Sequence, residues 1–139
     1  MTRLAAFAAV LAAALAIAGV AAAASDAEIE TRYTPALQKC LDSPDGVSTM
    51  GQIGCIADEL KIQDGRLNAA YRKAMGKLTP GQKTKLQAAQ RAWIAFRDAD
   101  CAAQQDEDWG TLSRVIANQC VLSRTVERTI ELEHYPPET

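Results

Sequence analysis

The sequence predicts an all-α fold: a small antiparallel bundle of one short and three longer helices, stapled by two disulfides. Three observations support this fold class. Apolar residues recur every three or four positions over long stretches, whereas the alternation typical of strands is nearly absent. Helix-start signals recur along the chain. Four cysteines follow an apolar leader in a chain of 139 residues, and this even count indicates disulfides formed in an oxidising compartment.

Residues 1–24 are predicted to be a signal peptide. Arg3 precedes an apolar run over residues 4–20, and the small residues that follow form a cleavage site. We expect cleavage after Ala24, which leaves a single domain over residues 25–139 in the periplasm or outside the cell. The alternative is an uncleaved membrane anchor, because the run is about long enough to span a bilayer. Its alanine-rich composition favours cleavage, after which no stable membrane insertion is expected.

The short helix and the first long helix have clear start signals. Thr34-Pro35 places an N-cap before a proline at the first helical position, which predicts a short helix towards Leu41. Residues 43–46 are typical of a turn. Thr49-x-x-Gln52 is a capping box that opens a long helix to about Leu78. Glycines weaken that helix in isolation, so tertiary packing must stabilise it.

Two further long helices complete the bundle. Thr79-Pro80-x-Gln82 repeats the capping device and starts a helix to about Asp106. Residues 109–111 form a connector. The last helix runs to about Glu133, and the side chains expected on its buried face are Leu112, Val115, Ile116, Leu122, Val126 and Ile130.

The cysteine positions predict how the disulfides pair. Residues equally far from the turn of an antiparallel helical hairpin lie level with each other. Cys40 and Cys55 are level about the first turn, and Cys101 and Cys120 are level about the last connector. We therefore expect Cys40–Cys55 and Cys101–Cys120; Cys55–Cys101 with Cys40–Cys120 stays open, because Cys55 and Cys101 are nearly level about the Thr79 turn. No C-x-x-C pair is present, which disfavours a zinc or redox site.

The helix over residues 90–101 carries a mixed face of polar, aromatic and thiol groups that needs partners. Register about the Thr79 turn pairs Asp64 with Arg97, offset by about 4.5 Å along the axis. We interpret them as a buried ion pair that fixes helix register rather than as a catalytic or ligand-binding pair. The same register completes a structural polar core, with Tyr71 beside Gln90 and with Trp93 near Leu67 and Tyr71.

Several function classes are disfavoured. Removing Arg3 from the 15 basic residues leaves 14 against 17 acidic ones, so a nucleic-acid partner is not expected. His134, the one histidine, lies in the C-terminal tail, which argues against a nucleophile–histidine arrangement. Asp98 and Asp100 point to different helix faces, and no glycine-rich phosphate loop follows a strand. We predict no enzyme activity, no cofactor and no metal site.

An ordered series of short motifs covers residues 33–132: Cys40, Thr49-x-x-Gln52-x-x-Cys55, Asp64-x-x-Leu67-Asn68-x-x-Tyr71, Gln90-x-x-Trp93, Arg97-Asp98-x-x-Cys101, Gly110-Thr111, Cys120 and Thr125-x-x-Arg128. This series resembles the LprI-like lysozyme-inhibitor family. The family often has Glu at Gln52 and a longer Gly-Gly-Ser connector at Gly110-Thr111. The resemblance implies an exported, all-helical, disulfide-bonded domain, and some relatives are proposed to bind and inhibit lysozyme.

The acidic connector offers a candidate partner-binding surface: Asp106, Glu107, Asp108 and Trp109. Three acids beside a tryptophan would combine electrostatic steering with an aromatic anchor. The structural alternative is that Asp108 caps the last helix and Trp109 closes the end of the core. We therefore expect a binding protein that blocks lysozyme or a similar cationic cell-wall hydrolase. The alternative functions are a non-inhibitory periplasmic structural or interaction module and a small-molecule binder.

Overall fold

The structure is a computed structural model that describes residues 24–136. It confirms the all-α fold within that range. The elements, in chain order, are α1 (Asp26–Thr31), α2 (Pro35–Leu41), the 3-10 turn η1 (Pro44–Val47), α3 (Thr49–Gly76), α4 (Pro80–Ala102), the 3-10 turn η2 (Glu107–Trp109) and α5 (Thr111–Glu133). The predicted signal peptide lies outside the described residues except for Ala24. Within those residues, no helix is long and apolar enough to cross a membrane.

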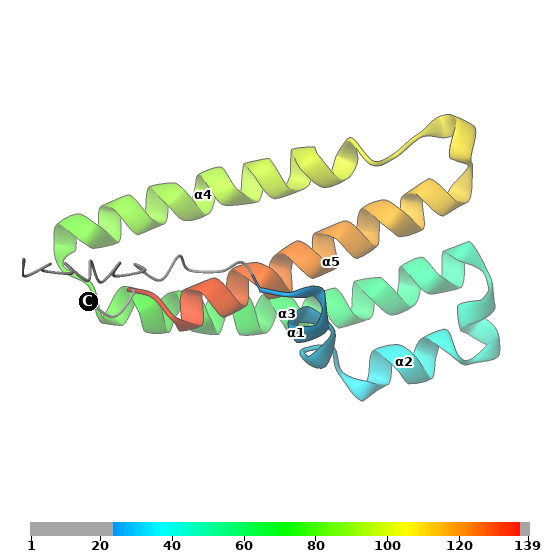
Figure 1. Cartoon of the computed structure of the whole chain (residues 1–139), viewed down its shortest axis with the longest axis horizontal. Coiled ribbons are helices and arrows are strands. Elements are labelled where there is room, and N and C mark those ends of the chain that lie inside the picture. Colours follow the sequence, from blue (N-terminus) through cyan, green and yellow to red (C-terminus); the bar gives the residue numbers. More distant parts are fainter. Residues whose placement is uncertain (1–23, 137–139) are drawn as a thin grey trace, which may run out of the picture.

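The three long helices run in alternating directions, so α3 and α5 are parallel and α4 is antiparallel to both (Figure 1). The most extensive helix–helix interface joins α3 to α5, whereas α4 leans against α5 with much less contact. The short helix α2 folds back along the first part of α3, and α1 rests on α5. Because α3 and α5 are parallel, both helices begin at the same end of the bundle.

Helix α5 links all parts of the core. Leu132 joins the cluster of α3 and α4 side chains near the α3–α4 turn, and Leu122 joins a second cluster with residues of α2 and α3. Val126 and Ile130 pack against Ile29 of α1. Of the six residues that the amphipathic pattern placed on the buried face of the last helix, Leu122, Val126 and Ile130 are buried. Val115 and Ile116 are half-buried, and Leu112 is exposed.

The helix boundaries differ from the prediction in three places. Ser48, not Thr49, is the N-cap of α3 and accepts a hydrogen bond from the Gly51 N–H, so the capping box predicted there is wrong. The box at Thr79 and Gln82 is confirmed. Helix α4 ends at Ala102 rather than near Asp106, because the chain leaves the helix to form η2. A second short helix, α1, was not predicted; Ser25 caps it.

The structure confirms the two predicted disulfides. The Cα atoms of Cys40 and Cys55 lie 5.7 Å apart, and those of Cys101 and Cys120 lie 5.5 Å apart. Both separations fall within the ordinary range for a disulfide. The alternative pairing is excluded. One disulfide ties α2 to α3 and the other ties α4 to α5, and both lie towards the end where α3 and α5 begin.

The structure contains the predicted Asp64–Arg97 ion pair, but the contact is long and Asp64 is not buried. The side chain of Asp64 is 48% exposed, and its carboxylate is 4.0 Å from the guanidinium of Arg97. Arg97 makes shorter contacts with the Asp98 carboxylate at 2.8 Å and the Thr125 hydroxyl at 3.1 Å. The physical reason is that α4 leans on α5, so Arg97 reaches Thr125 of α5.

Gln90 and Trp93, two other members of the predicted polar core, both contact Arg128 of α5. The side-chain oxygen of Gln90, Oε1, accepts a hydrogen bond of 3.1 Å from Arg128. No side-chain hydrogen bond joins Gln90 to Tyr71 among the described residues. Trp93 packs in the cluster that contains Leu67 and Tyr71. The guanidinium carbons of Arg97 and Arg128 lie 5.2 and 5.9 Å from the centre of the Trp93 ring, within cation–π range.

Candidate functional site

The α4–α5 connector, residues 103–110, places the predicted acidic residues and Trp109 on the surface. The Asp106 carboxylate accepts a hydrogen bond of 2.8 Å from the Asp108 N–H and caps η2. Gly110 then adopts a φ of 61°, a conformation that L side chains rarely take, and turns the chain into α5. The Trp109 side chain is 63% exposed.

All four predicted surface residues are therefore exposed, and the structural alternative for them is wrong. Asp106, not Asp108, has the capping role, and it caps η2 rather than α5. Gly110 is the N-cap of α5. Trp109 does not close the core, because most of its surface faces solvent. An exposed tryptophan in a connector has no packing role that would explain it, which favours a role in binding.

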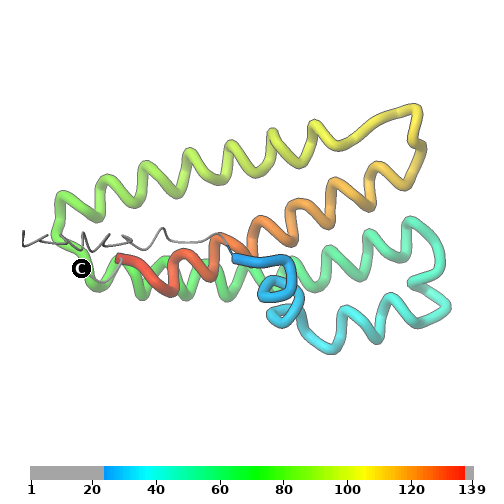
Figure 2. Tube along the Cα trace, in the orientation of Figure 1, coloured from blue at the N-terminus to red at the C-terminus, as the bar shows by residue number. Residues whose placement is uncertain are grey.

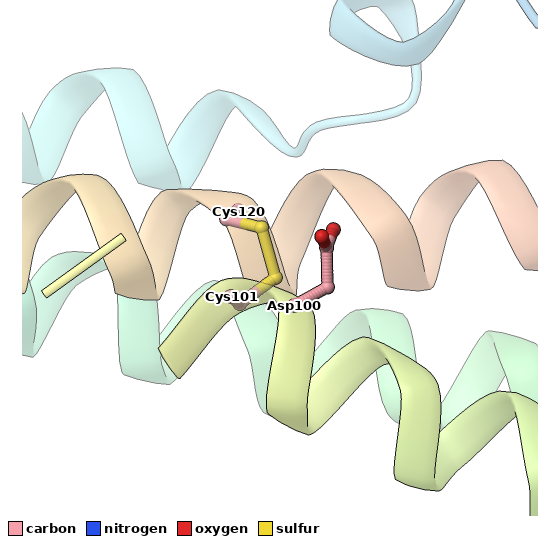
Figure 3. Close-up of side chains that lie close together, drawn as sticks. All are labelled: Asp100, Cys101 and Cys120. Carbon is pink, nitrogen blue, oxygen red and sulfur yellow. A yellow bond between two sulfur atoms is a disulfide. The ribbon is translucent and has the colours of Figure 1, made fainter. Parts of the chain in front are cut away.

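Contacts with α5 and the Cys101–Cys120 disulfide hold this connector in place. Figure 3 shows the Cys101–Cys120 bond with the Asp100 carboxylate beside it. The Gln104 amide donates to Cys120 Sγ at 3.2 Å, and the buried Ser113 hydroxyl donates to the Gly110 carbonyl at 2.8 Å. The connector is thus fixed at its start and at its end.

The group of Asp100, Cys101 and Cys120 has the composition of a metal site, but its chemistry is already satisfied. The two sulfurs are bonded to each other, so neither is a thiolate that could ligate a metal. The Asp100 carboxylate is 3.3 Å from the guanidinium of Arg124. The Glu127 hydrogen bond and the two nearby carboxylates raise the pKa of Arg124 above its ordinary value, so Asp100 already has a cationic partner within the protein.

The connector also borders a hollow of about 530 Å³. Its lining comprises residues 105–107, 110 and 111 of the connector and the start of α5, together with Ser113 and Arg114. Carboxylates of Asp106 and Glu107 stand on its wall, and Arg114 is the single basic residue there. A hollow of this size and charge can accept a lysine or arginine side chain of a partner.

A second, larger hollow is an open groove of about 780 Å³ between α1, α3 and α5. Apolar side chains of α1, α3 and α5 line much of it, and the polar side chains that α5 contributes have partners within the protein. The Tyr33 hydroxyl is 3.0 Å from that of Ser123 and accepts from the Gln119 amide at 3.1 Å, and burial raises the pKa of Tyr33. Arg124 is paired with two carboxylates. The groove is open to solvent on one side, and the paired polar groups on its α5 side already have partners within the protein.

A buried carboxylate, which the sequence did not reveal, fixes the chain between α1 and α2. Glu59 of α3 is 2% exposed and accepts hydrogen bonds from the Thr34 N–H and hydroxyl and from the Gln63 amide. The amide of Gln63 and the guanidinium of Arg66 also donate to the Arg32 carbonyl. Every group in this network has a partner, so we assign it a structural role.

Burial and hydrogen bonding act in opposite directions on Glu59. Burial is the largest single effect and alone would raise the pKa of Glu59. The hydrogen bonds from Thr34 and Gln63, together with the charge of Arg66, outweigh it and hold that pKa below its ordinary value of 4.5. A signal for this site was present in the sequence: Glu59 and Gln63 lie one turn apart on the buried stripe of a long helix.

Comparison with known proteins identifies relatives of the chain. A family model described as "Lysozyme inhibitor LprI" matches residues 40–132. The chain is 29% identical over 106 residues to an uncharacterized protein of Rhizobium meliloti (strain 1021), and the match covers 66% of this chain and 76% of that protein. No solved structure matches. The matched family region includes all four cysteines and the α4–α5 connector.

Proposed function

Because the chain belongs to the LprI lysozyme-inhibitor family, we propose that it binds and inhibits lysozyme or a similar cationic cell-wall hydrolase through the α4–α5 connector. The single observation that carries this proposal is the exposure of Trp109 beside Asp106, Glu107 and Asp108 on a braced turn. Two disulfides and the predicted signal peptide support export, which would bring the protein to such a hydrolase.

The charge of the connector supports a cationic partner. Three carboxylates lie within residues 106–108, and Arg114 is the nearest base that shares the hollow with them. Complementary charge steers a basic protein towards this end and selects against acidic partners. The acidic hollow would then accept a basic side chain, while the indole supplies apolar contact area.

The rigidity of the connector supports binding by a preformed surface. Asp106, Gly110 and the Cys101–Cys120 disulfide fix the turn before any partner arrives. Little backbone entropy would be lost on association, so more of the contact energy would appear as affinity. Exposed tryptophans are frequent energetic hot spots in protein interfaces. The site offers contact and charge rather than a nucleophile, so blocking a hydrolase is the activity that it supports.

The test is inhibition of lysozyme by the purified mature protein and its variants. We expect Trp109→Ala to weaken inhibition by about thirtyfold, because loss of a hot-spot aromatic costs about 2 kcal/mol or more. The separate variant Glu107→Lys should also weaken inhibition at low ionic strength, and its inhibition should depend less on salt concentration. Asp106 is left intact, because its carboxylate caps η2.

Two matched variants serve as controls. Phe96→Ala removes another exposed aromatic side chain, on α4, and Asp58→Lys reverses another exposed acid, on α3. Both should inhibit like the original protein, and all four variants should melt at similar temperatures. If the original protein neither inhibits nor binds lysozyme or other cationic hydrolases, the proposal is wrong and the alternative of a non-inhibitory interaction module is favoured. If Trp109→Ala inhibits normally, the connector is not the binding surface.

A further inference from the structure

Exposed apolar side chains gather at one end of the bundle. Seven large apolar residues are exposed among residues 24–136. Four of them lie in or directly after two connectors at the same end, the α2–α3 connector (residues 42–48) and the α4–α5 connector: Val47, Met50, Trp109 and Leu112. Their exposed fractions are 78%, 63%, 63% and 54%. Leu112 was expected on the buried face of the last helix; that prediction is wrong, because Ser113 takes the buried side of this first turn and Leu112 lies on the exposed side. Exposed apolar groups concentrated in this way mark interaction surfaces.

A hydrogen bond joins the first residues of α3 and α5, the helices that follow the two connectors. The Thr49 hydroxyl donates to the Thr111 hydroxyl at 3.0 Å, across 62 residues of sequence. Val47 and Met50 lie within two residues of Thr49, and Trp109 and Leu112 lie within two residues of Thr111. Figure 2 shows the chain reaching the same end of the bundle at both connectors. All four exposed apolar residues thus lie within two residues of the pair that joins α3 to α5 at this end.

We propose that the α2–α3 connector forms the second half of the partner-binding surface, with Val47 and Met50 contacting the same cationic protein as Trp109 and Leu112. The proposal rests on the proposed function and extends it to a segment distant in sequence. The partner is a protein with a basic rim around an apolar patch. We call the composite surface of the two connectors, with Val47, Met50, Trp109 and Leu112, the tip.

The α2–α3 connector is as firmly built as the α4–α5 connector. The Cys40–Cys55 disulfide closes it, and Gly46 and Gly51 let the chain approach itself closely. A Cβ at Gly46 would overlap the Leu41 carbonyl oxygen, and one at Gly51 would overlap the Asp45 carbonyl oxygen. Val47 is held outward on this compact turn, which is the arrangement expected of a preformed contact rather than of a loose loop.

Charge selects a basic partner over a second copy of this chain. Asp45 of η1 adds a fourth exposed acid to the three of the α4–α5 connector, against Arg114 as the basic residue of the hollow. In a symmetric dimer through the tip, the same acids would face each other across the interface. Juxtaposed like charges are costly, whereas a basic rim would complement them.

The closing experiment compares Val47→Ser/Met50→Ser with Ile62→Ser/Ile94→Ser in the mature protein. The control pair also removes two exposed aliphatic groups, but on α3 and α4 away from the tip. With hen egg-white lysozyme as the probe, we expect the tip variant to raise the inhibition constant by about tenfold or more and the control to leave it unchanged. Melting temperatures should be similar for both.

The outcomes separate the two proposals. If the tip variant inhibits like the control while Trp109→Ala loses inhibition, the composite surface is overturned and the proposed function stands. If neither the original protein nor any variant inhibits or binds lysozyme, both proposals are overturned. Sedimentation of the free protein tests the remaining occupant: a stable dimer that Val47→Ser/Met50→Ser dissociates would assign the tip to self-association and overturn the inference.

Discussion

The two ends of the bundle both carry large apolar side chains but use them differently. At the end where α3 turns into α4, Leu78, Leu86 and Leu132 are buried in one cluster with alanines of α3 (Figure 1). At the tip, Val47 and Trp109 face solvent, although their connectors are the more heavily cross-linked. Apolar side chains thus hold one end together, while covalent bonds hold the other.

This difference separates stability from recognition. An end that closes on its own core gains hydrophobic stabilisation and has no apolar surface left for a partner. An end that keeps its apolar groups exposed forgoes that stabilisation and needs another constraint, which disulfides supply. The comparison predicts that damage at the closed end changes stability without changing binding, and that damage at the tip changes binding.

The largest effect is expected at the closed end. Leu86 is 2% exposed and is the main buried aliphatic side chain of α4, so Leu86→Ala should lower the free energy of unfolding by about 2–5 kcal/mol. Urea denaturation followed by circular dichroism measures this. Inhibition per folded molecule should be unchanged, because Leu86 lies at the opposite end from the tip. A parallel loss of affinity under conditions where the variant is fully folded would break the comparison.

The next effect is expected at the tip. Cys40→Ser/Cys55→Ser opens a loop of 15 residues and should cost about 3 kcal/mol by the loop-entropy account. Unlike Leu86→Ala, this variant should also lose affinity for the partner while folded, because Val47 would no longer be held outward. Binding titrations below the unfolding transition separate the two losses. Unaltered affinity would show that the α2–α3 connector is not preorganised for binding.

The sequence predicted local structure well and helix partners less well. The Thr79 capping box, the end of α5 at Glu133 and both disulfides follow from short-range spacing, and the structure confirms them. The register argument found the Asp64–Arg97 contact but missed the exposure of Asp64 and the shorter bond from Arg97 to Thr125, because register about a turn assumes that consecutive helices pack most closely. Here the main interface joins α3 to α5, which are separated by α4 in sequence, and no periodicity within one helix reveals that choice.

The candidate site shows the same division. Its acids and tryptophan were recognisable as a cluster within four residues, and the structure places them on the surface. The proximity of Val47 and Met50 to these residues could not be predicted, because it depends on α3 and α5 starting at the same end. Leu112 fits the apolar stripe of α5 in the sequence, but Ser113 is the buried residue of that first helical turn and Leu112 is exposed.

Between the two ends, the hydrogen bonds of Glu59 help to hold the α1–α2 junction, and their effect should be the smallest of the three. Glu59→Gln replaces an acceptor with an amide whose N–H groups face the Thr34 and Gln63 donors. We expect a loss of about 1–3 kcal/mol at neutral pH. Because the folded pKa of Glu59 lies below 4.5, its contribution is present above the unfolded pKa and is lost as pH falls through the folded value.

Denaturation of both proteins at pH 7 and at a series of values below 4.5 measures this contribution. The original protein should lose stability on acidification more steeply than Glu59→Gln, so the difference between them should shrink as Glu59 is protonated. A constant difference across this series would mean that the carboxylate charge is not what holds the junction. Inhibition at pH 7 should be unaffected by the substitution, because Glu59 is buried and presents no surface to a partner. The middle of the bundle would then be sensitive to acid, while the disulfides at the tip keep the binding surface intact.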